Sequence, residues 1–368
     1  MITYRSLPVA IAPLAPVPLE EVCPPQFSLG PPAQIVQNTA ASREGTDANV
    51  NRTKPIIDYA AYLAVRTVVC VIQAIPLETC QAWSRRLGWF LWHVARLRRG
   101  TVEENLQTAF PEKTSAEREA IALAMWEHLL LMVCEIAQAP RKINRTNWRS
   151  HLNMPQMLLM VRRLLDRRPV IIISGHLGNF EMGGYLLGLH GFPTHTIART
   201  LDNRYLDRWI NDFREATGQY ILPKHGSSQQ IEELLKSGGT LVLLGDQHAG
   251  EAACWVDFFG RRASTHKAVA LFTLSGNAPT ATGCVYRRGG PMEFEMEVAD
   301  LVDPADPDFS LGSIPLLTQW YTRGLEALIR VEPGQYWWLH RRWRDQKNDR
   351  REYRDRRRAV EQQTKKAA

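Results

Sequence analysis

The amino-acid sequence predicts an α/β protein with a mostly parallel mixed sheet flanked by helices, preceded by an N-terminal membrane-associated helical region. Two observations carry the prediction for the sheet. From Val170 onward, short apolar runs of strand length alternate with helix-like stretches, which is typical of βαβ units and parallel sheets. Residues 280–286 and 293–298 instead read as two strands joined through a Gly-Gly-Pro link at 289–291, which predicts an antiparallel edge.

The chain of 368 residues, with 45% hydrophobic and 23% charged residues, has the composition of a globular protein with a large core. Its six cysteines are scattered, without a CxxC pair or a His at metal-ligand spacing. This pattern favours reduced thiols in a cytosolic setting over a disulfide framework. Because neither a CxxC pair nor a His at metal-ligand spacing is present, we also expect no metal site.

Residues 1–54 read as a disordered, proline-rich extension, because eight prolines fall within the first 32 positions and no periodic apolar pattern appears. These prolines also interrupt the apolar run that a signal peptide needs. The next segment, 55–100, is predicted to form membrane-associated helices. Of its residues 56–75 only Asp58 and Arg66 are charged, and twenty helical residues span about 30 Å.

In 82–99, tryptophan and phenylalanine are interleaved with arginine, a pattern that suits a membrane interface on the cytoplasmic side. The alternative is a pair of buried helices in a soluble domain. The sequence leaves open whether the segment crosses a membrane or lies on its surface.

The main domain is predicted at 101–345, with a helical lead-in at 101–167 and an α/β core at 168–345. In the lead-in we expect helices at 115–137 and 154–165. In the core we expect strands at 170–174, 194–198, 220–222, 240–244, 280–286 and 293–298, a turn at 258–260, and helices at 182–189, 203–217, 227–237, 266–275 and 314–330. Asp202 is the expected N-cap of the helix at 203–217.

The most informative stretch is the end of the strand at 170–174, which is followed by Gly175 and His176, with Glu181 five residues further on. In one ideal helix His176 and Glu181 would point about 140° apart. They can meet only if His176 lies in the turn before a helix and Glu181 in its first turn. A carboxylate on one ring nitrogen of His fixes the tautomer and leaves the other nitrogen as a base.

Ligands of parallel sheets bind beyond the carboxyl ends of the strands. Asp246 and Gln247 directly follow the strand at 240–244. Because His176 also follows a strand, we expect these side chains to share one cleft.

Positive charge is concentrated at the C-terminus. From Arg341 onward there are 12 Lys or Arg against 5 Asp or Glu, whereas residues 1–340 carry 33 of each sign. A basic tail at 346–368 could bind anionic head groups or nucleic acid, or form a solvated helix of mixed charge.

The chain resembles the lipid A biosynthesis acyltransferases of the lauroyl and myristoyl type, within the lysophospholipid acyltransferase superfamily. The motifs that carry this resemblance appear in order along the chain: Asn105-Leu106 with Phe110-Pro111, SGHLGNFE at 174–181, ARTLDN at 198–203, Arg214, Gly218 and Lys224, GDQHAG at 245–250, DFFGRRAST at 257–265, and YWWLHRRW at 336–343. The resemblance implies a glycerolipid acyltransferase-like fold. It also implies attachment to the cytoplasmic face of the bacterial inner membrane.

By this resemblance the protein is an O-acyltransferase that moves a fatty acyl chain from acyl carrier protein to a hydroxyl of a glycolipid such as a lipid A precursor. Coenzyme A is the alternative carrier, and either thioester would be a co-substrate, with no cofactor needed. A phosphatidylinositol mannoside, an aminolipid or a lysophospholipid are alternative acceptors. Two other hypotheses are a nucleic-acid-binding protein using the basic tail, for which the sequence holds no recognition motif, and a membrane-anchored scaffold with an inactive site.

In this hypothesis His176 is the general base and Glu181 orients it. Candidate substrate-binding residues are Arg199, Asp246, Gln247, Asn179 and Lys224. Arg199 could clamp a phosphate, or form a surface ion pair with Asp202 or Asp207. Asp246 and Asn179 could alternatively only shape turns, and Lys224 could be a solvated side chain. Ser174 is not in a G-x-S-x-G elbow, so direct transfer to the acceptor is favoured over a serine acyl-enzyme.

The segment 336–343 could form a lipid-facing belt or a wall that binds the head group, with core aromatic residues and exposed arginines as the alternative. Besides its tryptophans it carries His340, Arg341 and Arg342.

Overall fold

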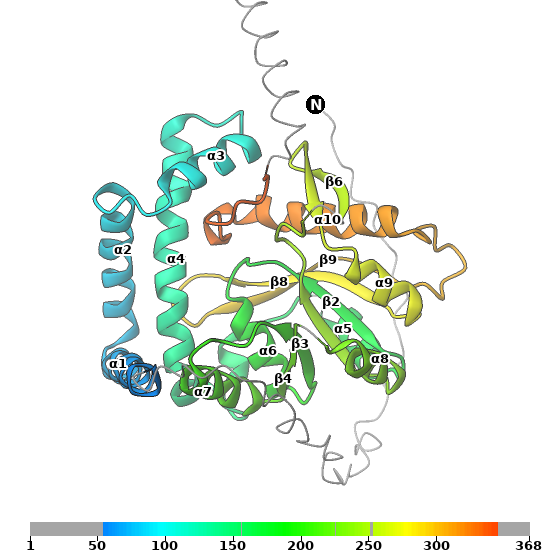
Figure 1. The fold of residues 1–368 in the computed structure, drawn as a ribbon, viewed down its shortest axis with the longest axis horizontal. Coiled ribbons are helices and arrows are strands. Elements are labelled where there is room, and N and C mark those ends of the chain that lie inside the picture. The colour runs from blue at the N-terminus through cyan, green and yellow to red at the C-terminus, as the bar shows by residue number, and fades with distance from the viewer. Residues whose placement is uncertain (1–53, 156, 225, 251–252, 345–368) are drawn as a thin grey trace, which may run out of the picture. The chain divides into compact units, whose positions relative to one another are not determined.

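The computed structural model describes residues 54–155, 157–224, 226–250 and 253–344. The predicted proline-rich extension, apart from Lys54, and the predicted basic tail lie outside these residues. Figure 1 shows a central sheet with helices on both faces and a group of helices beside it.

The sheet has seven strands in the order β1-β9-β8-β2-β5-β3-β4. Their bounds are β1 Leu152–Asn153, β2 Val170–Ser174, β3 Thr194–Ala198, β4 Gln219–Pro223, β5 Thr240–Leu244, β8 Thr280–Arg287 and β9 Phe294–Val302. All neighbouring strands are parallel except β8 and β9. The mostly parallel mixed sheet is thus confirmed, but the antiparallel pair is not at the edge, because β1 lies outside β9.

Helices cover both faces of the sheet (Figure 1). The helices that follow β1 in the chain are α5 Met157–Leu164, α6 Phe180–Leu189, α7 Arg204–Glu215, α8 Ser228–Lys236, α9 Ala268–Ser275 and α10 Ile314–Val331. Apolar side chains of α8, α9 and α10 pack on Ile171 and Ile173 of β2. Ile172 points to the opposite face, where α5 packs near it. Alternation along β2 therefore gives the sheet two separate apolar layers.

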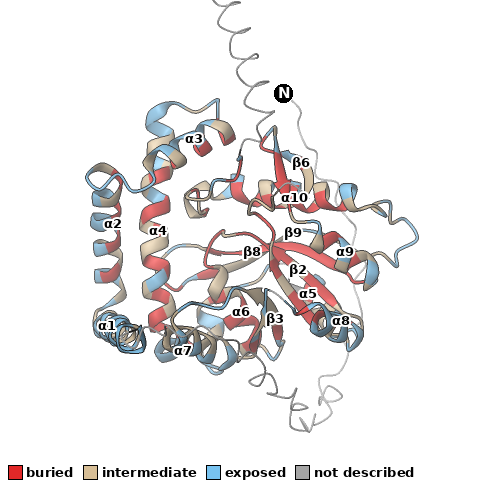
Figure 2. Ribbon diagram, viewed as in Figure 1, coloured by how far each residue is buried: buried red, intermediate tan, exposed pale blue. Residues whose placement is uncertain are grey.

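The helical lead-in consists of α1 (Lys54–Ala74), α2 (Leu77–His93), α3 (Arg99–Ala109) and α4 (Ser115–Lys142). Helix α4 begins with a capping box between Thr114 and Glu117 and continues through Pro140, beyond the end that the apolar pattern predicts. Figure 2 shows the contrast between the largely buried face of α4 and the exposed surface of α1. Both helices are long and apolar enough to cross a membrane.

One local prediction is wrong, and one hairpin was not predicted. Asn203, not Asp202, caps α7, because its side-chain oxygen accepts from the backbone N–H groups of Tyr205 and Leu206. The predicted turn at 258–260 connects two strands that the sequence analysis missed, β6 (Cys254–Phe258) and β7 (Arg261–Thr265). The hairpin lies outside the main sheet and packs on α10.

Candidate active site

A strand, a tight turn and a helix hold His176 at the edge of the sheet. Strand β2 ends at Ser174 and α6 begins at Phe180, so His176 lies in the turn and Glu181 in the first helical turn, as predicted. The turn requires Gly178, which has φ +60° and whose position leaves no room for a Cβ, because a Cβ would overlap the carbonyl oxygen of Val285. The turn is therefore pressed against β8.

Asn179, a predicted substrate-binding residue, instead supports this turn. It is fully buried, its Oδ1 accepts from the backbone N–H of Met182, and its Nδ2 donates to Glu135. Glu135 also pairs with Arg287. This buried ion pair joins residues far apart in the chain and has no recognisable pattern in the sequence.

Asp246 orients His176. Its Oδ1 lies 2.9 Å from Nδ1 of His176, and its Oδ2 accepts from the backbone N–H of the same residue at 2.9 Å. The register of the strands explains the contact. Ser174 of β2 pairs with Leu244 of β5, and His176 and Asp246 each lie two residues beyond this pair. Asp246 was predicted as substrate-binding, but with only 1% of its surface exposed it is placed behind the ring of His176.

The predicted contact between Glu181 and His176 is not the one that the structure shows. Both carboxylate oxygens of Glu181 accept from Arg214 of α7, at 2.6 Å and 3.0 Å. The start of α6 turns this side chain toward α7, whereas Asp246 approaches from the strand next to β2. Glu181 still lines the same cavity as His176.

The other ring nitrogen of His176 faces Gln247. With the Nδ1 proton bound to Asp246, Nε2 is the acceptor, and the Gln247 amide nitrogen lies 3.1 Å from it. The same amide nitrogen lies 3.2 Å from Nε2 of His340. The ring of His340 stacks on Trp337. Thus the segment 336–343, predicted as a belt or a wall, brings a second imidazole close to His176.

The pKa values of the dyad follow from burial and charge. Burial opposes protonation of His176, but the attraction of Asp246 and their hydrogen bond outweigh it and raise the pKa of His176 above its ordinary value. Burial favours the neutral form of Asp246. The charge of His176, together with the side-chain and backbone hydrogen bonds that His176 donates to the carboxylate, nevertheless holds the pKa of Asp246 low. Burial, with His176 nearby, lowers the pKa of His340 to about 4, so His340 is neutral at pH 7.

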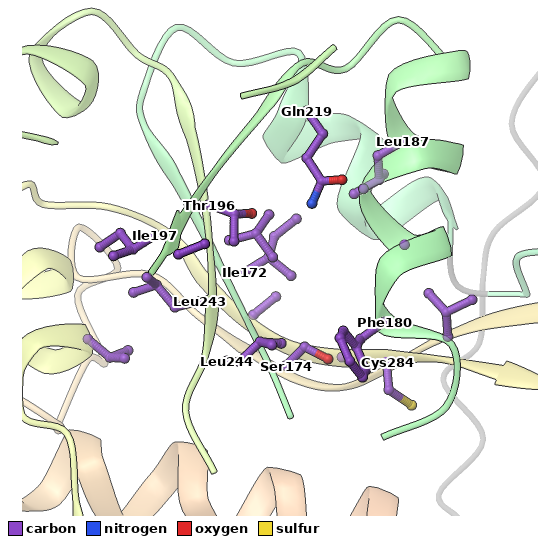
Figure 3. Close-up of a pocket in the computed structure, with 18 of the residues that line it drawn as sticks. Ile172, Ser174, Phe180, Leu187, Thr196, Ile197, Gln219, Leu243, Leu244 and Cys284 are labelled. Carbon is purple, nitrogen blue, oxygen red and sulfur yellow. The ribbon is translucent and has the colours of Figure 1, made fainter. Parts of the chain in front are cut away.

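A largely apolar cavity of about 660 Å³ opens at His176. Figure 3 shows aliphatic side chains of the sheet strands and Phe180 of α6 around it. Arg199, Lys224 and Gln247 line it as well. Arg199 is largely exposed and pairs with Asp202 at 3.2 Å, the alternative contact that the sequence analysis named. Lys224 is exposed at the end of β4.

The structure therefore brings His176, with the carboxylate of Asp246 on its ring, to a largely apolar cavity. A family model of bacterial lipid A biosynthesis acyltransferases matches residues 50–345. The chain belongs to this family. This confirms the resemblance and the enzyme class, an O-acyltransferase.

Curated relatives of this acyltransferase carry corresponding names. The lipid A biosynthesis palmitoleoyltransferase of Escherichia coli (strain K12) is 21% identical over 280 residues, covering 73% of this chain and 86% of the relative. The lipid A biosynthesis lauroyltransferase of the same strain is 20% identical over 292 residues, covering 78% and 92%. Among solved structures, the 1-acyl-sn-glycerophosphate acyltransferase of Thermotoga maritima aligns with 72% of this chain and 99% of its own, at 13% identity and a TM-score of 0.33.

The pH dependence of this acyltransferase is a first prediction. A general base must be neutral, so kcat/KM falls as the pH drops through the pKa of His176. Because that pKa is raised, we expect the midpoint of the acidic limb above the ordinary histidine value of about 6.5. Initial rates measured between pH 5 and pH 9, roughly two units either side of neutrality, locate the limb. A midpoint below the ordinary value would contradict the assignment of a carboxylate-paired histidine as the base.

Proposed function

We propose that this acyltransferase moves a fatty acyl chain from the thioester of acyl carrier protein to a hydroxyl of a glycolipid such as a lipid A precursor. The observation that carries the proposal is the His176–Asp246 pair at the mouth of an apolar cavity. His176 accepts the proton of the acceptor hydroxyl, and the apolar cavity is suited to a hydrocarbon chain. The names of the curated relatives, which specify palmitoleoyl and lauroyl transfer in lipid A biosynthesis, support the same substrate class.

In the proposed reaction, Nε2 of His176 takes the proton of the acceptor hydroxyl, and the hydroxyl oxygen bonds to the thioester carbonyl carbon. Asp246 stabilises the imidazolium that forms. The amide of Gln247 lies within hydrogen-bond distance of Nε2, so it must release the base when the acceptor enters and can then donate to the developing oxyanion. The carbon–sulfur bond breaks, and the imidazolium returns the proton to the leaving thiolate. The acyl thioester is a co-substrate, and the scheme uses no cofactor.

Arg199 and Lys224 are proposed to bind anionic groups of the substrates. Both follow strands at the same edge as His176, and both line the cavity. A guanidinium is a fork for phosphate oxygens, and Arg199 can exchange its exposed partner Asp202 for such a group. An acidic carrier protein or a phosphorylated head group would both meet positive charge here.

In the assay for this function, the purified full-length chain is given a labelled acyl chain on acyl carrier protein or, in parallel, on coenzyme A. Each donor is tested with separate acceptors: a lipid A precursor, a phosphatidylinositol mannoside, an aminolipid and a lysophospholipid. We expect labelled acyl chains on the lipid A precursor. Transfer only to another acceptor would reassign the substrate, and transfer only from acyl coenzyme A would reassign the donor. No transfer to any acceptor from either donor would contradict the proposed function and favour the scaffold hypothesis.

We also propose attachment to the cytoplasmic face of the bacterial inner membrane, with α1 lying on the membrane surface. Several large apolar side chains of α1 and α2 are exposed, including Ile56, Trp83 and Trp89. Contacts at both ends hold α1 against the domain: Asn203 donates to the carbonyl of Asp58, and Gln73 donates to that of Ala137. A helix held in this way presents its free side to the membrane interface without crossing it.

Membrane attachment gives a further prediction. Burying one large apolar side chain contributes about 1.5–3 kcal/mol, so replacing both Trp83 and Trp89 with Asp should lower binding to anionic phospholipid vesicles by at least about tenfold. Vesicle flotation measures the binding, and a double variant at two exposed apolar positions of α10, Leu316→Asp with Val331→Asp, is the control. Alkaline carbonate should release the wild-type chain from membranes, whereas retention would indicate a spanning helix.

A further inference from the structure

The cavity at His176 reaches both faces of the sheet. On one face it is lined by Ile172, Thr196 and Leu187, beside α6. On the other it is lined by Ile231, Val269 and Phe272, from α8 and α9. Ile231 and Val269 belong to the apolar layer of α8, α9 and α10, whereas Ile172 packs with α5 on the opposite layer. We name these two parts of the cavity the α6 arm and the α8–α9 arm.

A gap between β3 and β5 connects the two arms. Their ladder ends where Thr196 pairs with Val242, although the strands continue to Ala198 and Leu244. Strand β3 remains paired with β4 up to its last residue. The carboxyl-terminal ends of β3 and β5 therefore separate.

Side chains from both faces line this gap. Neighbouring residues of a strand point to opposite faces, yet Thr196 and Ile197 both line the cavity, as do Val242 and Leu243. In Figure 3 the side chains of Ile197 and Leu243 lie to the left, and Leu187 and Gln219 lie to the right. The cavity thus passes between the strands and has two apolar branches, and His176 lines the same cavity.

The two arms differ in the charge at their openings. In the α6 arm, Arg214 is neutralised by Glu181 through two hydrogen bonds. Beside the α8–α9 arm lie Lys224, for which the described residues supply no ion pair, and the first turn of α8, whose residues Ser227 and Ser228 line the cavity. An anionic head group attached to an alkyl chain is attracted to the second opening.

We propose that the α6 arm holds the acyl chain being transferred and that the α8–α9 arm holds an acyl chain already present on the acceptor. This inference rests on the proposed function and adds to it a separate site for each of the two chains, one on each face of the sheet. A single donor chain fills one branch, and the second branch gives the acceptor chain an apolar site on the opposite face of the sheet. The acceptor hydroxyl is then presented to His176 from that side.

Matched substitutions test the two arms separately. Ile231→Trp fills the α8–α9 arm and Leu187→Trp fills the α6 arm, and both positions are buried. The donor is labelled acyl carrier protein, and the acceptors are an acylated lipid A precursor and the same disaccharide without acyl chains. We expect Ile231→Trp to raise the acceptor KM about tenfold and to reduce the preference for the acylated acceptor. We expect Leu187→Trp to raise the donor KM and to shift the preference toward shorter acyl chains.

Phe272→Trp, at a half-buried position of the α8–α9 arm, is the second variant, and thermal unfolding of each variant verifies its fold. If Ile231→Trp and Phe272→Trp change the donor KM or the chain-length preference, and leave the acceptor KM unchanged, the proposed division of the arms is overturned. Wild-type transfer that does not distinguish the acylated from the chain-free acceptor also overturns it. No transfer by the wild-type chain contradicts instead the proposed function, so the two failures are distinguishable.

Discussion

Replacing His176 with alanine is expected to lower the kcat of acyl transfer by about 10²–10⁴-fold, the range that a general base contributes. The Nε2 atom of His176 faces the cavity, while its other ring nitrogen is bound to Asp246. Without the imidazole, the acceptor hydroxyl has no base at this position, and the leaving thiolate has no proton donor. The ring also partners the buried carboxylate of Asp246, so its removal should lower the melting temperature as well, and circular dichroism must verify that the variant is folded.

Single-turnover transfer from labelled acyl carrier protein measures this loss without the step of product release. His340→Ala is the matched comparison, because His340 contacts the same amide of Gln247 but, among the residues that the structure describes, has no hydrogen bond to a carboxylate. We expect a smaller loss from His340→Ala than from His176→Ala. If His340→Ala loses more activity than His176→Ala, and His176→Ala retains activity, His340 is the general base instead.

Much of the sheet was predictable from the sequence for a physical reason. Strands β2, β3 and β5 have the predicted bounds. Strands β2 and β5 are continuous, largely buried apolar runs with sharp ends, whereas β3 is a short, mostly half-buried strand with polar residues at its start. Strand β1 has only two residues, too few for a recognisable pattern, and its pairing outside β9 depends on tertiary contacts. The hairpin of β6 and β7 was missed because its exposed positions carry Asp257 and Arg262, so it lacks a continuous apolar run.

The members of the site were easier to predict than their pairing. Position after a strand correctly brought His176, Asp246 and Gln247 together, although only His176 and Gln247 line the cavity. Closeness in the sequence suggested Glu181 as the partner of His176, but adjacency in the sheet decides the contact, because β2 and β5 pair in register. No sequence pattern reveals strand order, so Asp246 could be placed in the cleft but not on the ring.

The contacts that support the turn at 175–179 could not be predicted from the sequence, because they join segments that lie far apart in the chain. Glu135 of α4 and Arg287 of β8 form a buried ion pair that also binds Asn179. Nε2 of His128 lies 3.1 Å from the carbonyl oxygen of Gly178, with its other ring nitrogen against Arg287. Burial lowers the pKa of His128 to about 3, so this ring is neutral and its Nε2 is free to donate to the turn. The helical lead-in therefore contributes directly to the geometry of the catalytic turn.

The identity of the orienting carboxylate leads to the second prediction of large effect. Asp246→Asn should lower kcat by about 10³–10⁴-fold, because an amide at this position no longer fixes the tautomer of His176 or stabilises its imidazolium. Glu181→Gln should lower kcat much less, since Glu181 binds Arg214 rather than the base. Both substitutions preserve side-chain volume, so each is the steric control for the other.

The pH profile distinguishes a lost orienting charge from a general structural defect. In Asp246→Asn the charge that raises the pKa of His176 is gone while burial, which lowers it, remains. The acidic limb of kcat/KM should therefore move to lower pH, and in Glu181→Gln it should move less, because Asp246 contributes more to the raised pKa than Glu181 does. If Glu181→Gln instead shows a larger kcat loss and a larger shift of the limb than Asp246→Asn, Glu181 is the residue that orients His176. The ion pair of Glu181 with Arg214 would then have to rearrange when substrate binds.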